Sequence, residues 1–244
     1  SKVYINTKEK AFKKLNCFFL TFIFSSTTKE TSIIDLIKKL NNNNKFHGIL
    51  IQLPLPKTFN TKKILHTVDP SKDVDGFHPF NLGLLLEGNP SFVPCTPNGI
   101  IEILKYYNID TIGKHAVIVG RSNIVGKPMF ALLAQNFQMG NATVTICHTK
   151  TKNLKEITLQ ADILIAAVGS PNLINSSMIK KGVDIIDVGI NRVASDNKKG
   201  YSLIGDVDTN SVLGKANSIT PVPGGVGPLT ISMLINNTIK AAMK

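Results

Sequence analysis

The sequence predicts an α/β protein in which a doubly wound parallel sheet is joined to a smaller α/β part. Four short apolar runs rich in Val and Ile are separated by helical or loop segments: HAVIVG (115–120), ATVTIC (142–147), DILIAAVG (162–169) and DIIDVGI (184–190). Strands that alternate with helices are typical of a parallel sheet covered on both faces. We therefore place the doubly wound part at roughly Thr111 to Ser218. Helix and strand patterns also alternate up to about residue 95.

The first part begins with an apolar run, Cys17 to Phe24, which is far shorter than the roughly 20 residues that span a bilayer. We expect it to be a buried strand. A helix is predicted over 27–41, with Thr28 or Thr31 as N-cap and an apolar face formed by Ile33, Ile34, Ile37 and Leu40. The segment 47–56 then predicts a short buried strand that contains one polar residue, Gln52.

Two further helices flank the sheet region. The segment 95–108 predicts a connecting helix with Thr96 as N-cap and Pro97 at its first position, where a missing N–H costs nothing. The tail, 220–244, predicts a loop rich in Pro and Gly followed by an amphipathic helix that starts near Pro228.

Composition excludes several classes of function. The 28 basic and 16 acidic residues give a formal charge of +12, but the basic residues are scattered and show no run and no alternation with aromatic residues. This pattern indicates a solvated surface, so we expect neither a nucleic-acid nor a membrane partner. Neither the three cysteines nor the five histidines have the spacing of a metal site, and the absence of paired cysteines favours a reducing compartment.

The turn after the run 115–119 has the order strand, glycine, helix that is typical of a phosphate-binding turn. Gly120 allows close approach, and the helix after Gly126 directs its N-terminus at the same place. The spacing is not GxGxxG, so a plain tight turn remains an alternative. Arg121 lies beside the turn, and the next run ends in Thr149 and Lys150 with no acidic residue. Unless these are ordinary surface charges, they favour the 2′-phosphate of NADP over NAD.

Several motifs in order along the chain carry a resemblance to a known family: GILIQLPLP, KDVDGFHPFNLG, FVPCTPNG, VGRSNIVGKP, IDVGIN and ITPVPGGVGPLT. Together they resemble the bifunctional methylenetetrahydrofolate dehydrogenase/methenyltetrahydrofolate cyclohydrolase (FolD) family. The resemblance implies a folate-binding catalytic domain (1–95 and 219–244) and a Rossmann-like NAD(P)-binding domain (96–218), with a cleft between them, and usually a homodimer. The family's N-terminal strand and helix precede the position that matches Ser1.

The resemblance also implies the site residues of the folate side. Tyr4 and Lys8 match a YxxxK segment that faces the folate, and their i, i+4 spacing puts them on one helix face. Gln52 matches a glutamine that hydrogen-bonds the lysine, and Asp75 matches the carboxylate that binds the pterin ring. The loop that closes over the folate is matched by Pro223, Gly224 and Gly225.

On the cofactor side, the family's dinucleotide-binding turn is matched by Gly120, Arg121 and Ser122. Thr149 matches a position near the 2′-phosphate, and Ile190 a residue whose backbone meets the nicotinamide end. We assign Cys95 to packing and Asp73 to capping of the turn before Gly76.

The implied function is oxidation of 5,10-methylenetetrahydrofolate by NADP, followed by hydrolysis of the methenyl product to 10-formyltetrahydrofolate. Lys8 is the expected proton-transfer group, Gln52 positions it, and Tyr4 stacks on the p-aminobenzoyl ring. The alternatives are a dehydrogenase without cyclohydrolase activity and an inactive, truncated fragment that binds folate or nucleotide. The expected partners are tetrahydrofolate derivatives, and the expected location is the cytoplasm, with an organelle left open.

Overall fold

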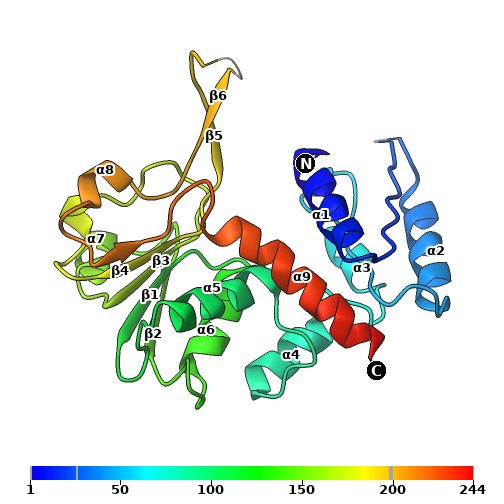
Figure 1. Ribbon diagram of the computed structural model, residues 1–244, viewed down its shortest axis with the longest axis horizontal. Helices are drawn as coiled ribbons and strands as arrows, with labels where there is room; N and C mark the ends of the chain where they lie inside the picture. The colour runs from blue at the N-terminus through cyan, green and yellow to red at the C-terminus, as the bar shows by residue number, and fades with distance from the viewer. Residues whose placement is uncertain (1, 26, 198–199, 244) are drawn as a thin grey trace.

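A computed structural model describes residues 2–25, 27–197 and 200–243, without the side chains of residues 2–4. Its centre is a five-stranded parallel sheet in the order β2-β1-β3-β4-β7 (Figure 1). The strands are β1 (His115–Val119), β2 (Thr143–Cys147), β3 (Ile163–Ala166), β4 (Asp184–Asp187) and β7 (Ser218–Ile219). The four predicted runs are therefore confirmed as parallel strands, and β7 extends the sheet beside β4.

Alternating side chains of the strands fill two apolar cores, one on each face of the sheet. Ala116 and Ile118 pack with α5 (Cys95–Tyr106) and α6 (Gly126–Ala134). The intervening residues of the same strands pack on the other face against three short elements: α7 (Leu154–Thr158), η1 (Ser176–Met178) and α8 (Thr209–Val212). Burial on both faces explains why the strands read as continuous apolar runs.

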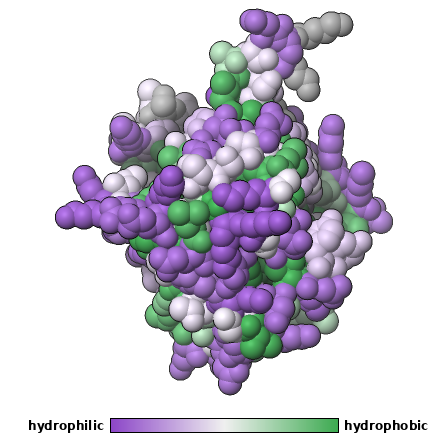
Figure 2. Space-filling model, turned by 90° about the vertical axis from the view of Figure 1, so that its left-hand side faces the viewer, coloured by the Kyte–Doolittle hydropathy of each residue, from purple (hydrophilic) through white to green (hydrophobic). Residues whose placement is uncertain are grey.

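A two-stranded antiparallel hairpin, β5 (Asn191–Ala194) and β6 (Tyr201–Ile204), projects from the carboxyl edge of the sheet (Figure 1). The guanidinium of Arg192 lies 3.5 Å from the centroid of the Tyr201 ring, a cation–π contact across the hairpin. The sheet end of the molecule, below this hairpin, presents mostly hydrophilic side chains with only scattered apolar ones (Figure 2). The hairpin itself was not predicted.

The N-terminal part contains α1 (Lys2–Lys14), α2 (Glu30–Asn41), α3 (Thr61–Leu65) and α4 (Pro79–Glu87). The predicted apolar face of α2 is confirmed, because its three buried isoleucines pack on Ile49, Ile64 and Val68. Its predicted N-cap is wrong: Lys29 holds that position without a side-chain bond.

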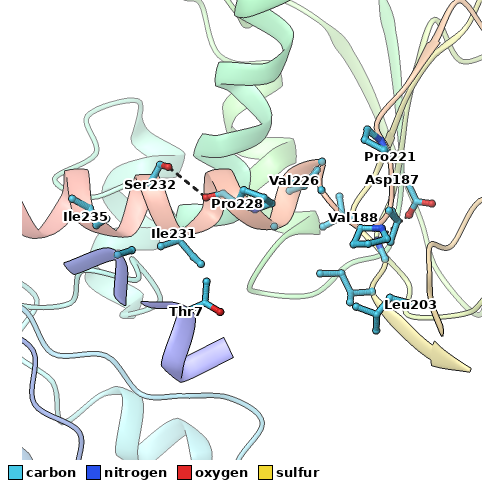
Figure 3. Close-up of a pocket in the computed structure, with 18 residues that line it drawn as sticks. Thr7, Asp187, Val188, Leu203, Pro221, Val226, Pro228, Ile231, Ser232 and Ile235 are labelled. Atoms are coloured by element: carbon cyan, nitrogen blue, oxygen red, sulfur yellow. Dashed lines mark hydrogen bonds between the residues drawn. The ribbon is translucent and has the colours of Figure 1, made fainter. Parts of the chain in front are cut away.

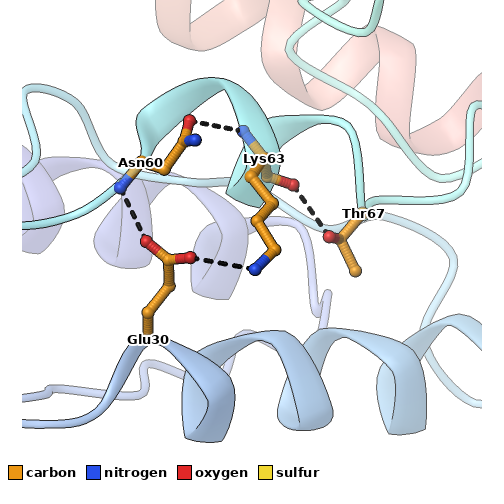
Figure 4. Close-up of polar contacts among 4 residues, drawn as sticks. All are labelled: Glu30, Asn60, Lys63 and Thr67. Atoms are coloured by element: carbon orange, nitrogen blue, oxygen red, sulfur yellow. Dashed lines mark hydrogen bonds and ion pairs between the residues drawn. The ribbon is translucent and has the colours of Figure 1, made fainter.

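Glu30 supplies the polar link between α2 and α3 instead. Its carboxylate accepts from the Asn60 backbone N–H at 2.7 Å and pairs with Lys63 Nζ at 3.3 Å (Figure 4). Asn60 in turn caps α3 by accepting from the Lys63 backbone N–H. One acidic side chain therefore ties the start of α2 to the start of α3.

The prediction of a buried strand over Cys17 to Phe24 is wrong. The segment is extended, but within the described residues it belongs to no strand, and Phe18 and Ile23 are 76% and 85% exposed. The predicted strand 47–56 is reduced to one parallel bridge between Ile49 and Asp73. An apolar run indicates a tendency to be buried, but a strand also needs a neighbouring strand for its hydrogen bonds.

Helix α9 (Val226–Ala242) packs on both parts of the molecule (Figure 1). Its first turns contribute Val226 to the core between the sheet and α5, and Leu234 further along packs with Phe12 and Val74 of the N-terminal part.

The expected N-cap of α5 is wrong, since Pro94 holds that position. The Thr96 hydroxyl is engaged elsewhere, in a 3.0 Å hydrogen bond with the hydroxyl of Thr230 in α9.

In the part of the chain that the structure describes, no helix is both long and apolar enough to cross a membrane.

We expect Gly120→Ala to destabilise the fold by at least about 2 kcal/mol, because a Cβ there would overlap the carbonyl oxygen of Ala167 and φ is +130°. Gly83→Ala is the control: it lies on the exposed face of α4 with nothing within 4 Å, so it should stabilise by about 0.5–1 kcal/mol. Urea unfolding of both variants checks this. Equal effects would contradict the close packing of Gly120.

Candidate functional site

A cavity of about 430 Å³ lies between the N-terminal part and the carboxyl edge of the parallel sheet. Its walls come from α1, from the end of β4, from Leu203 of β6, from the loop 221–225 and from α9. Figure 3 shows Thr7 and Ile231 on one side and Val188 and Leu203 on the other. The cavity is therefore built by segments that are distant in sequence.

Four of the predicted site residues line this cavity. Pro223, Gly224 and Gly225 form its loop, and Ile190 lies at the end of the segment that follows β4. Gly224 has φ +108°, a conformation that favours glycine. The structure thus places the loop predicted to close over a ligand beside the residue predicted to meet a nicotinamide.

Lys8 lies on α1, next to the cavity-lining Thr7, and is only 5% exposed. Its ammonium donates to Gln52 Oε1 at 3.2 Å. Burial lowers the pKa of Lys8, and the negative charge of Asp75 opposes that shift. A lysine with a lowered pKa is a candidate for proton transfer at neutral pH.

Burial raises the pKa of Asp75 to about 6, against the opposing effect of the Lys8 ammonium. The Cys95 thiol lies 3.8 Å from Asp75 Oδ1 and 3.4 Å from the Val74 carbonyl oxygen. Burial and the Asp75 charge raise the pKa of Cys95, so this thiol remains protonated. Cys95 is therefore not only a packing residue, because its thiol also donates toward Asp75 and the Val74 carbonyl oxygen.

Asn237 of α9 fastens this region, and sequence reasoning missed it. Its buried amide donates to the carbonyl oxygens of Val74 and Val93, each at 2.9 Å, and lies 3.7 Å from the Cys95 sulfur. A polar residue on the apolar face of the last helix was the available signal. A helix from the other end of the chain thus holds the backbone directly before Asp75 and the segment that leads into α5.

The two remaining predictions on the folate side have different outcomes. Asp73 caps the turn as expected, because its carboxylate accepts from the backbone N–H groups of Phe77 and His78 at 3.2 and 2.7 Å. Tyr4 falls within α1, but its side chain lies outside the described part of the structure. Its predicted position against a ligand therefore stays a prediction.

The predicted dinucleotide turn forms a second group at the carboxyl ends of β1 and β2. Gly120 leads from β1 into an exposed loop that contains Arg121 and Ser122, and Ser122 Oγ accepts from the Val125 N–H just before α6. Thr149 is exposed after β2. The structure does not bring these four residues into the cavity described above.

This turn fits a dinucleotide. Gly120 itself carries no side chain at the end of β1, and α6 presents its N-terminus after the exposed loop. No carboxylate directly follows β2, where it would repel a 2′-phosphate. A metal centre has no comparable support, since no group of three potential metal ligands occurs within the described ranges.

Two family models match the chain. Residues 1–75 match the catalytic domain of tetrahydrofolate dehydrogenase/cyclohydrolase, and residues 94–244 match the NAD(P)-binding domain of the same enzymes. The chain belongs to this family. Its fold is accordingly that of a two-domain α/β protein with catalytic and NAD(P)-binding domains.

Individual relatives agree with this assignment. The bifunctional protein FolD of Acetivibrio thermocellus is 52% identical over 99% of this chain and 82% of its own length. The Campylobacter jejuni FolD crystal structure matches with a TM-score of 0.92 at 47% identity, covering 99% of this chain and 83% of that one. Trypanosoma brucei FolD, complexed with NADP cofactor and inhibitor, matches with a TM-score of 0.93 at 35% identity, covering 99% and 82%.

The raised pKa of Asp75 makes the stability of this family member depend on pH. The folded state binds the Asp75 proton up to about pH 6, whereas the unfolded chain loses it near 3.8, so the contribution of Asp75 to stability falls as pH rises between these values. As pH rises across this window, the free energy of unfolding of the unmodified protein should fall by on the order of 3 kcal/mol relative to that of Asp75→Asn. Urea unfolding of both proteins at a series of pH values measures the difference, and a difference that does not change with pH would contradict it.

Proposed function

We propose that this chain oxidises 5,10-methylenetetrahydrofolate to 5,10-methenyltetrahydrofolate with NADP and hydrolyses the product to 10-formyltetrahydrofolate. The observation that carries the proposal is the buried Lys8 ammonium, hydrogen-bonded to Gln52 with Asp75 nearby and adjacent to the cavity. A dehydrogenase that lacked the second activity would not need a lysine kept at a lowered pKa. Membership of a family whose relatives are named bifunctional supports both activities.

The folate occupies the cavity and the adjoining Lys8 region. Asp75 accepts hydrogen bonds from the pterin ring, for which a carboxylate offers two oxygens side by side. We assign Tyr4 to the p-aminobenzoyl ring on the family resemblance alone, since its side chain lies outside the described part of the structure. The loop Pro223, Gly224 and Gly225 holds the folate toward Ile190. These contacts orient the methylene bridge, and orientation is the main contribution of the protein to a hydride transfer.

In the first reaction a hydride, with its electron pair, leaves the methylene carbon. Bound NADP accepts it at the nicotinamide ring, and the folate becomes the methenyl cation. Ile190 and the loop 221–225 form an apolar wall of the cavity, against which the reacting rings are aligned. No proton needs to move, so the reaction depends on alignment rather than on an acid or a base.

In the second reaction water adds to the methenyl carbon. A new C–O bond forms, the bond between this carbon and N5 breaks, and both protons leave the water oxygen: one ends on N5 and the other is released to solvent, as the positive charge of the methenyl substrate requires. Lys8 accepts and returns the proton, because its lowered pKa increases the fraction of neutral amine. Gln52 positions the amine through the 3.2 Å hydrogen bond.

NADP extends from this cavity to the turn at Gly120. The pyrophosphate approaches Gly120 and the N-terminus of α6, and Arg121, Ser122 and Thr149 surround the adenosine end. The solved relative that is complexed with NADP supports this choice of cofactor.

Three further assignments belong to the proposal. The folate-binding domain comprises 1–95 and 219–244 and the NAD(P)-binding domain 96–218, with α9 packed on both. The working form is a homodimer that associates through the nucleotide-binding domains. The cytoplasm is the proposed location, since the described cysteines Cys17, Cys95 and Cys147 are all free thiols, as a reducing compartment maintains them.

Lys8→Met should reduce cyclohydrolase activity by at least about 100-fold and dehydrogenase activity much less, because only the second reaction needs proton transfer. Conversion of the methenyl substrate and formation of NADPH are measured separately. Lys10→Met, an exposed lysine of the same helix, is the matched control and should leave both activities unchanged. Equal, mild losses for Lys8→Met would contradict its role.

Arg121→Ala should raise KM for NADP by roughly 10- to 100-fold and leave KM for NAD nearly unchanged, because one charge-assisted bond to the 2′-phosphate is lost. Initial rates with each cofactor test this. Lys155→Ala removes an exposed cation of α7 and serves as the control. The assignment fails if Arg121→Ala affects both cofactors equally.

A further inference from the structure

Two buried carboxylates lie at the carboxyl edge of the sheet, and the mechanism above does not use them. Asp187 ends β4 and Asp206 follows β6, and their exposed fractions are 1% and 0%. The segment after Asp187 continues directly into Val188, Gly189 and Ile190, which line the cavity. Asp187 also lines the cavity, and in Figure 3 its carboxylate points away from Thr7 and Ile231 on the opposite side.

Asp187 is held entirely by backbone donors. Its Oδ1 accepts from the N–H groups of Gly189 and Asp206, and its Oδ2 from that of Val207, each at 2.9 Å. The carboxylate is enclosed so closely that a Cβ at Gly205 would overlap it. The end of β4 is thereby joined to the chain after the hairpin.

Asp206 makes the corresponding bonds to the chain after β3. Its Oδ2 accepts from the N–H groups of Val168 and Gly169 at 2.7 and 3.0 Å. Its Oδ1 accepts from the Ser170 N–H at 2.9 Å and from the Asn191 side-chain amide at 2.8 Å. Asp206 therefore joins the end of β3 to the base of the hairpin.

Both carboxyl groups act as hydrogen-bond acceptors in this arrangement. Every hydrogen-bond partner named for them is an N–H donor, so a proton on either carboxyl would face another donor instead of an acceptor. Burial and the Asp206 charge raise the pKa of Asp187, and its three backbone donors oppose that shift. Dipoles that are fixed by the fold thus reduce the cost of burying two like charges without cancelling it.

No cationic side chain neutralises this pair within the described residues. The ion pairs there join Lys13 with Glu9, Lys63 with Glu30, and Lys180 with Asp162. Backbone dipoles stabilise the two charges locally but leave a net negative charge at the cavity wall. In surroundings of low dielectric constant such a charge acts over a longer distance than it would in water.

We propose that Asp187 and Asp206 form a specificity-determining anionic pair that makes the site bind the cationic nicotinamide ring of oxidised NADP more tightly than the neutral ring of NADPH. The inference rests on the proposed function, which places the nicotinamide beside Ile190. Ile190 and Asn191 directly connect the two carboxylates to that position. The pair favours entry of the oxidised cofactor and release of the reduced one.

The test compares dissociation constants for NADP and NADPH, measured separately by titration calorimetry without folate. The two forms share their phosphates and riboses, so any general disturbance of the site cancels in the ratio of the constants. Asp206→Asn should weaken the binding of NADP by about tenfold relative to the binding of NADPH, since one of the two charges is removed. An unchanged ratio would show that Asp206 only supports the fold.

A second variant keeps every hydrogen bond of the pair. Ser170→Lys retains the backbone N–H that Asp206 accepts and adds a cation on a partly exposed side chain, so it should shift the ratio in the same direction by a smaller factor. It decides the question if Asp206→Asn does not fold. Asp184→Asn, at the amino end of β4, is the matched control and should leave the ratio unchanged.

The outcomes separate this inference from the proposed function. If the unmodified chain binds neither form, the proposed function fails and this inference with it. If it binds both and the ratio is unchanged in Ser170→Lys and in any folded Asp206→Asn, the inference alone is overturned. The inference is also overturned if Asp184→Asn shifts the ratio as much as Ser170→Lys and Asp206→Asn do.

Discussion

The hydrogen bond between the buried Lys8 ammonium and Gln52 is the interaction on which the rest of the site depends. A charged amine taken out of water is costly unless it is paired, and here the Gln52 oxygen and the nearby Asp75 charge compensate it. These groups come from α1, from the segment after Ile49 and from the turn before α4. The amine keeps its place only if all three segments keep theirs, so the chemistry of Lys8 is set by the packing of the whole N-terminal part.

Helix α9 connects this packing to the parallel sheet. Its Asn237 amide fixes the backbone beside Asp75, whereas its first turns and the preceding loop form a wall of the cavity next to the end of β4. Asp187 and Asp206 perform a similar task on the other side, where backbone N–H groups from three separate segments converge on them. The region around Lys8 and the region around Ile190 are therefore held by different networks that meet at one cavity.

Sequence predicted the parts of the structure that local pattern determines. The parallel strands are buried on both faces, so their apolar runs identified them, and Gly120 and Gly126 marked the turn before α6. The run Cys17 to Phe24 misled because hydrophobicity does not specify a strand partner. The hairpin was missed because its residues are partly exposed and carry no apolar run. For Lys8 and Gln52 only the family resemblance gave the pairing, and nothing local indicated that Asp187 and Asp206 lie together.

The most direct test of the central claim is an assay of this chain with 5,10-methylenetetrahydrofolate and either NADP or NAD, in which reduced cofactor and methenyl product are followed together. We expect turnover that prefers NADP, with little accumulation of the methenyl intermediate because Lys8 promotes its hydrolysis. Turnover with full accumulation of the intermediate would contradict the role given to Lys8 and Gln52. Binding of NADP without any turnover would contradict the claim that the chain forms a working folate site.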